Sequence, residues 1–180
     1  MKKLLFSTKF LVMLSVIAFG FSACKKDGGG GLVTDGWKIG STVYNVALSA
    51  RPSSNKLVFL DAIPTGGSTM NMLSIEFASS IATGTYTVTG DVTSSTLAAN
   101  EVRIMLPTGT DASGSTGKYY SLVNLPGTPA VTPTLTVTDA GSGKLKVVLS
   151  PVIMAEGDYS LPTSPLTGNT ATVEINATEK

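Results

Sequence analysis

Apolar and polar residues alternate in short runs from Trp37 to the end of the chain, and glycine, proline, asparagine, aspartate and serine separate the runs. A period of two residues is typical of β-strands that bury one face. Outside the N-terminal segment, no stretch sustains the apolar period of about 3.6 residues that marks an amphipathic helix. We therefore expect strands over residues 38–48, 56–63, 70–77, 85–89, 101–106, 119–123, 134–138, 144–153 and 171–178.

About nine short strands in one domain predict an all-β fold. We favour an antiparallel β-sandwich, with a β-barrel as the alternative. Residues 35–180 are long enough to form one domain with its own core. The alternation also predicts which residues face that core, such as Leu73, Ile75 and Phe77 in the third run.

The first 24 residues have the organisation of a secretory signal. Lys2 and Lys3 precede an apolar run over residues 10–19, which is shorter than the roughly 20 residues of a transmembrane helix. Small residues then lead to Cys24, the only cysteine of the chain. We expect residues 1–23 to be a lipoprotein signal peptide and Cys24 to be lipidated. An ordinary signal peptide with a chance cysteine is the alternative.

Residues 24–34 are expected to form a lipidated, glycine-rich tether. Four consecutive glycines, Gly28 to Gly31, make this segment flexible. A flexible chain of about 11 residues spans about 18 Å root-mean-square. Acyl chains on Cys24 would hold the protein at a membrane, since each buried methylene contributes about 0.8 kcal/mol.

The run from Phe21 to Asp27, followed by glycines, resembles Bacteroidetes-type lipoproteins. Gly84-Thr85-Tyr86 and the early Gly36-Trp37 resemble small lipoproteins of that group with an all-β domain. The resemblance implies an outer-membrane location, at the cell surface or otherwise on the periplasmic face. It carries no known activity, and therefore transfers no site residue.

Composition excludes several kinds of chemistry. The chain has no histidine, which removes the Ser-His-Asp triad and the commonest zinc ligand. Lys2, Lys3 and Lys9 leave with the signal, so 13 basic residues fall to ten against 12 acidic ones, and the side-chain charge becomes about −2. A near-neutral domain does not carry the basic patch of a nucleic-acid-binding protein. We expect no nucleic acid, no cofactor, no metal site and no enzymatic activity.

Three spacings suggest chemistry and have a plainer interpretation. Asp61 and Glu76 could pair as glycosidase carboxylates, but isolated surface acids are the more common case. The stretches 53–56 and 115–118 both read Ser-x-x-Lys, the spacing of serine acyl-enzymes, yet each is expected in a turn rather than on the required helix.

Exposed aromatic rings could form a glycan-binding platform, with candidates Trp37, Tyr44, Tyr119, Tyr120 and Tyr159. Tyr119 and Tyr120 are adjacent, so in a strand they point to opposite faces. We expect Tyr120 to be the exposed ring of the two. Trp37, the only tryptophan, is a ligand candidate that more often fills a core.

The sequence thus favours a lipid-anchored, non-enzymatic module for binding or envelope interaction. A glycan-binding accessory module of a surface uptake system and a pilus or adhesin-type subunit are the alternatives. The expected partners are the membrane, through the acyl chains, and a glycan or an envelope protein. The oligomeric state stays open.

Overall fold

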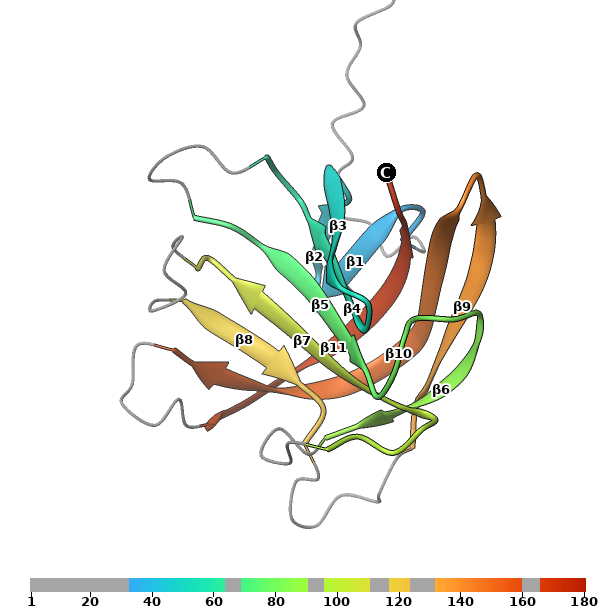
Figure 1. Ribbon diagram of the computed structural model, residues 1–180. Helices are drawn as coiled ribbons and strands as arrows, with labels where there is room; N and C mark the ends of the chain where they lie inside the picture. Colours follow the sequence, from blue (N-terminus) through green and yellow to red (C-terminus); the bar gives the residue numbers. More distant parts are fainter. Residues whose placement is uncertain (1–32, 64–68, 91–95, 111–116, 124–131, 160–165) are drawn as a thin grey trace, which may run out of the picture. The chain divides into compact units, whose positions relative to one another are not determined.

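The computed structural model describes residues 33–63, 69–90, 96–110, 117–123, 132–159 and 166–180, all within one compact unit. These residues form no helix and eleven strands, which confirms the all-β class (Figure 1). The strands are β1 (Gly36–Ile39), β2 (Thr42–Asn45), β3 (Leu48–Ser53), β4 (Lys56–Leu60), β5 (Met72–Phe77), β6 (Gly84–Thr89), β7 (Glu101–Thr108), β8 (Lys118–Ser121), β9 (Thr134–Gly141), β10 (Lys144–Asp158) and β11 (Leu166–Thr178).

Two more strands are present than the sequence pattern predicted, because the run 38–48 is interrupted. Gly40 has a φ of 59°, a conformation that favours glycine, and it turns the chain between β1 and β2. Leu48, expected at the end of the same run, instead begins β3. A hairpin and the start of a third strand therefore replace one long strand.

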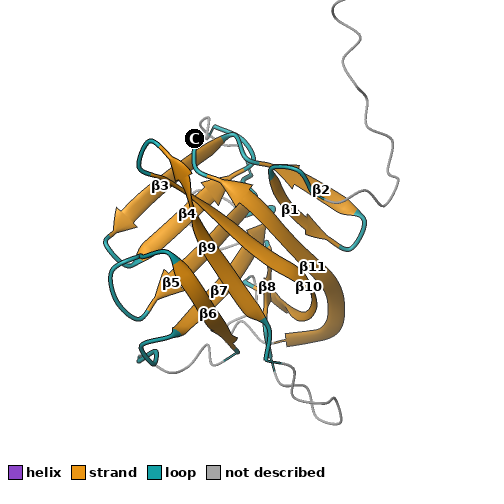
Figure 2. Ribbon diagram, turned by 90° about the vertical axis from the view of Figure 1, so that its right-hand side faces the viewer, coloured by secondary structure: helices purple, strands orange, loops and turns teal. Residues whose placement is uncertain are grey.

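All eleven strands belong to one connected sheet, with the order β2-β1-β11-β10-β9-β6-β7-β5-β4-β3. β8 lies off this path and pairs with both β10 and β7, so it connects two distant parts of the path. The pairing is antiparallel except between β6 and β7, which run parallel. The expectation of a wholly antiparallel sheet is corrected at that one pair. Figure 2 shows how the sheet folds back on itself.

The core lies on the inner face of this sheet. Leu73, Ile75 and Phe77 are buried on the face predicted for them. Other fully buried side chains come from strands across the sheet: Trp37, Leu57, Phe59, Val102, Ile104, Leu106, Leu135, Val147, Met154, Val173, Ile175 and Ala177. With about 25 cal/mol per Å² of buried apolar area, this core supplies the main stabilisation of the domain.

β10 and β11, of 15 and 13 residues, form a long hairpin (Figure 1). The pairing of the two strands shifts register between Leu149 and Val152, where Pro151 is exposed. Proline has no N–H to donate, so a bulge is where a sheet tolerates it. Beyond the bulge, Val152, Met154 and Glu156 point to the inner face in turn.

Candidate functional site

A buried carboxylate, Glu156, lies on the inner face near the end of β10. It follows Val152 and Met154 in the alternation and is only 5% exposed. Tyr120 of β8 lies directly opposite it in the register. Tyr120 is in turn opposite Leu106 of β7, which is fully buried in the core. Both polar side chains therefore share the inner face with the core.

Four side chains donate hydrogen bonds to Glu156. The Tyr120 hydroxyl binds Oε2 at 2.8 Å. Lys118 Nζ, Thr167 Oγ1 and Asn169 Nδ2 bind Oε1 at 3.1, 3.0 and 3.1 Å. We call these five residues the Glu156 cluster. β8, β10 and β11 each contribute to it, so the strand pairing at this end of the sheet positions every donor.

The donors keep Glu156 ionised. Burial raises its pKa, but the bonds from Tyr120, Asn169, Lys118 and Thr167 outweigh that effect and lower the pKa to about 2. Burial and the bond to Glu156 raise the pKa of Tyr120 to about 12. A carboxyl group with so low a pKa does not supply a proton at neutral pH, so the cluster is unsuited to general-acid catalysis.

A second polar group, Asp61 and Asn71, lies at the same end of the sheet. Asp61 accepts bonds from the Asn71 backbone N–H at 3.2 Å and from Asn71 Nδ2 at 2.8 Å. Burial, and after it the charge of Asp61, raises the pKa of Tyr44. Tyr44 in turn contributes to the raised pKa of Tyr120. Asp61, Tyr44 and the Glu156 cluster are therefore within electrostatic reach of one another.

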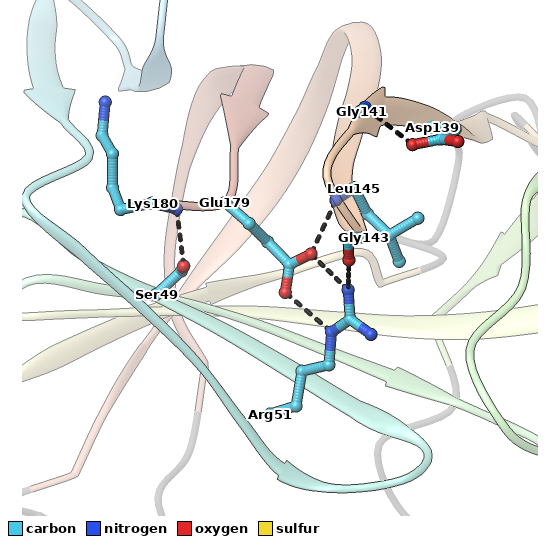
Figure 3. A network of polar contacts seen from close by, with 8 residues as sticks. All are labelled: Ser49, Arg51, Asp139, Gly141, Gly143, Leu145, Glu179 and Lys180. Atoms are coloured by element: carbon cyan, nitrogen blue, oxygen red, sulfur yellow. Dashed lines mark hydrogen bonds and ion pairs between the residues drawn. The ribbon is translucent and has the colours of Figure 1, made fainter.

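A different polar network, the Arg51–Glu179 clasp, joins the C-terminus to β3 and to the β9–β10 hairpin (Figure 3). Arg51 binds Glu179 through two bonds, Nε to Oε1 at 2.7 Å and Nη2 to Oε2 at 2.5 Å. Glu179 also accepts the Leu145 N–H at 2.6 Å, and Arg51 Nη2 donates to the Gly143 carbonyl at 2.9 Å. Two parallel bonds to one carboxylate fix its geometry.

The first and the last described residues meet beside the Arg51–Glu179 clasp. Asp35 accepts the Thr178 N–H at 3.0 Å and forms an ion pair with Lys180. The Val33 carbonyl accepts a bond from Asn176 at 2.7 Å. Thr178 lies nine positions after Asn169 in β11, about 30 Å of strand at about 3.3 Å per residue. The chain thus enters the domain far along β11 from the Glu156 cluster.

The two predicted aromatic candidates are both placed against the core. Trp37 is 0% exposed and stacks on Tyr44, with ring centroids 5.5 Å apart, so it fills the core as the plainer interpretation held. Tyr120 is half-buried, and its hydroxyl is bound to Glu156. Of the adjacent pair, Tyr120 is the more exposed ring, as predicted, since Tyr119 is buried. It is not a free ring, however, because its strand turns that face towards the core.

Tyr119 takes the opposite face, as predicted for adjacent strand residues, but that face is covered too. Its ring lies over Gly157, where an added Cβ would come within 2.0 Å of the ring. It also contacts Tyr159, with ring centroids 4.8 Å apart. Only glycine at position 157 leaves room for this packing.

The structure separates the two carboxylates considered as a glycosidase pair. Asp61 pairs with Asn71 at one end of the β4–β5 ladder, and Glu76 lies opposite Lys56 at the other. Five residues of strand separate Asn71 from Glu76, about 17 Å, which exceeds the roughly 5–10 Å that glycosidases use. Glu76 instead pairs with Arg103 at 3.1 Å.

Neither Ser-x-x-Lys stretch starts a helix among the described residues. Residues 53–56 form the β3–β4 turn rather than the start of a helix. Residue 115 of the second Ser-x-x-Lys stretch lies outside the described residues, and so does Cys24, the predicted lipidation site. Within the described ranges, no helix is long and apolar enough to cross a membrane, and no group of three metal-ligating side chains gathers.

Sequence reasoning missed Glu156, although the sequence contained a signal for it. Glu156 occupies the inner-face position of an alternating run whose two preceding inner positions, Val152 and Met154, are apolar. An acid in such a position must find donors or cost free energy. Its donors come from residues 38 positions upstream and 13 downstream, and no local pattern predicts that pairing.

The comparisons with known proteins add no relative. The chain matches no protein-family model, no curated protein and no solved structure.

Proposed function

We propose that this chain is a lipid-anchored lipoprotein of the outer membrane, displayed at the cell surface, that acts as a non-enzymatic binding module. The observation that carries the proposal is the order of segments around Cys24. A basic start and an apolar run precede the small residues before Cys24, and glycines follow it. The similarity to Bacteroidetes-type lipoproteins favours the outer membrane.

The arrangement of the domain is compatible with such an anchor. The chain enters the domain at Val33, beside the C-terminal residues and about 30 Å along β11 from Asn169. A tether attached there leaves the end that carries the Glu156 cluster free to face away from the membrane. A binding module needs this geometry if that end meets its partner.

Two glutamates with lowered pKa values are unsuited to act as general acids at neutral pH. Donors saturate Glu156, and Arg51 together with the Leu145 N–H holds Glu179. Both carboxylates are fixed in the ionised state, as in structural or recognition networks. A pilus-type subunit would be distinguished by a ladder of oligomers on gels, and a strictly monomeric protein would exclude it.

Membrane attachment is tested with Cys24→Ala, and Ser22→Ala serves as a control that keeps a small residue before the cleavage site. We expect Cys24→Ala to accumulate as uncleaved precursor or to leave the membrane fraction, whereas Ser22→Ala is processed normally. Processing and membrane retention of Cys24→Ala that match the natural chain would refute the anchor.

Surface display is tested with a thiol on the outer face of β10. Ile153 is 63% exposed, so Ile153→Cys supplies a reactive group, and acylated Cys24 does not react. A membrane-impermeant maleimide should label intact cells that carry this variant. Labelling that occurs only after the outer membrane is opened would place the domain on the periplasmic face.

A further inference from the structure

Six strand ends meet around the Glu156 cluster through backbone pairing. The end of β4 meets the start of β5 through the bond from Asp61 N to the Asn71 carbonyl. Met70 bridges to Thr110 beyond β7, and Thr108 of β7 pairs with Lys118 of β8. Lys118 pairs in turn with Asp158 of β10, which leads to the β11 pairing. We call this edge the rim.

The side chains on the inner side of the rim form a mixed aromatic and polar surface. Tyr44 and Tyr120 are half-buried against the core, so part of each ring stays accessible. Thr167 and Asn169 are exposed, and 53% of the Lys118 side chain is exposed. A few polar groups beside partly covered aromatic rings are the usual composition of a small-molecule site.

A buried donor without an acceptor lies in the core beside Tyr44. The indole Nε1 of Trp37 is fully buried and has no hydrogen-bond partner among the described residues. Trp37 stacks directly on Tyr44. The bond from Ala47 N to the Leu60 carbonyl, at 2.8 Å, brings the chain that follows β2 beside the end of β4 at the rim. A buried donor left unpaired costs roughly 1–3 kcal/mol, so native structures usually supply an acceptor from water or a ligand.

The charges at the rim indicate which ligands it would accept. Among the described residues of the rim, Asp61, Glu156 and Asp158 are three acids against the single base Lys118, so the surface repels anions. Carboxylates accept hydrogen bonds from hydroxyl groups, and the carboxamides of Asn71 and Asn169 both donate and accept them. Aromatic faces pack against apolar C–H surfaces. A neutral polyhydroxylated ring offers hydroxyls on its edge and C–H groups on its face.

We infer that the inner side of the rim, from Asp61 and Tyr44 to Tyr120, Glu156 and Asn169, binds a neutral saccharide. This inference rests on the proposed binding function and names the ligand class for it. The Thr167 hydroxyl and the Asn169 amide already donate hydrogen bonds to Glu156, which holds them in place. A sugar hydroxyl would bond to these groups or replace one of them.

Trp37 makes the inference directly measurable, because it is the only tryptophan of the chain and stacks on a proposed ligand contact. The lipid-processed protein in detergent micelles is titrated with maltohexaose, cellohexaose, xylohexaose and mannohexaose, and with an oligogalacturonate as the anionic probe. We expect one or more neutral oligosaccharides to shift Trp37 emission saturably and to release heat in calorimetry. The oligogalacturonate should do neither.

Conservative variants locate the site without unfolding the domain. Asp61→Asn and Tyr44→Phe should each weaken the saccharide by about 10-fold, which corresponds to about 1.4 kcal/mol. Tyr86→Phe is the matched control, since Tyr86 packs on the same core but donates to the Ala82 carbonyl. It should leave the affinity unchanged.

Three results would overturn the inference: no response to any neutral oligosaccharide, tighter binding of the anionic probe, or equal affinity in the Asp61→Asn, Tyr44→Phe and natural chains. None of these results bears on Cys24 processing or surface labelling. The inference and the proposed function can therefore fail separately.

Discussion

Two glutamates, Glu156 and Glu179, are buried at different places along the sheet, and different kinds of donor stabilise their negative charges. Glu179 is held by a bidentate arginine and a backbone N–H, and it joins the C-terminus to β3. Glu156 receives hydroxyl, amide and ammonium donors from side chains on neighbouring strands. The clasp thus ties the last residues to β3 and to the β9–β10 hairpin, which are distant in sequence. The cluster instead orders small polar groups on an accessible surface.

The difference suggests a division of labour. The clasp lies where the chain enters the domain, beside the Asp35–Lys180 ion pair. Rigid, charge-paired contacts there resist fraying of the termini. The Glu156 cluster is built largely from neutral donors that a ligand could share, and such preorganised groups lose less freedom on binding. Four changes test this contrast, from the largest expected effect to the smallest.

Loss of the clasp should have the largest effect. Glu179→Ala removes both arginine bonds and leaves the Leu145 N–H without its acceptor, so we expect a loss of about 2–3 kcal/mol in unfolding free energy. Urea denaturation followed by Trp37 fluorescence measures it. Glu76→Ala, which breaks only the Arg103 pair, should cost less than about 1 kcal/mol. Equal losses would show that the clasp stabilises the fold no more than the Glu76–Arg103 ion pair does.

Glu156→Gln removes the charge of Glu156 and should lower the free energy of unfolding by about 1–2 kcal/mol at neutral pH. Urea denaturation at a series of pH values measures this difference. The sign with pH follows from the pKa, which is lowered from 4.5 to about 2 in the folded state. The charge therefore stabilises the fold fully above about pH 4.5, and this stability disappears as pH falls towards 2. The natural chain and the variant should converge over that window. A constant gap would show that the carboxylate is not the stabilising form.

Loss of one neutral donor should matter less than loss of the acceptor. Tyr120→Phe removes a single bond of 2.8 Å while Glu156 keeps three other donors, so we expect a cost of about 0.5–1.5 kcal/mol. The same urea experiment measures it. A cost equal to that of Glu156→Gln would mean that Tyr120 alone holds the carboxylate.

The terminal ion pair should contribute least. Lys180 and Asp35 have side chains 44% and 34% exposed, so water and salt screen their attraction. Lys180→Ala should change the unfolding free energy by less than about 1 kcal/mol, and raising the salt concentration should shrink the difference further. A larger, salt-independent loss would place Lys180 inside the clasp itself.

Much of the fold was predictable because strand alternation is local. The inner faces of β5, β7 and β11 follow from residues two apart, and those positions are buried as expected. The interruption at Gly40 was harder to foresee, because a glycine among alternating residues marks a turn only when the following strand folds back. The parallel β6–β7 pair depends on contacts that no sequence window contains.

The candidate site was less predictable than the fold. The alternation correctly made Tyr120 more exposed than Tyr119, but the bond that holds the Tyr120 hydroxyl comes from Glu156, which lies 36 residues further along the chain. Trp37 was a ligand candidate for which the core was the more common position, and the structure buries it completely. The link between Asp61 and Tyr44 arises only when β2 and β4 are placed by the sheet.

The intact mass of the protein purified from membranes tests the central claim most directly. We expect a chain that begins at Cys24 and carries the added mass of acyl chains on Cys24. The Cys24→Ala protein should lack that mass. A chain that retains residues 1–23, or one that begins at Cys24 without acyl groups, would contradict the lipid anchor and the orientation inferred from it.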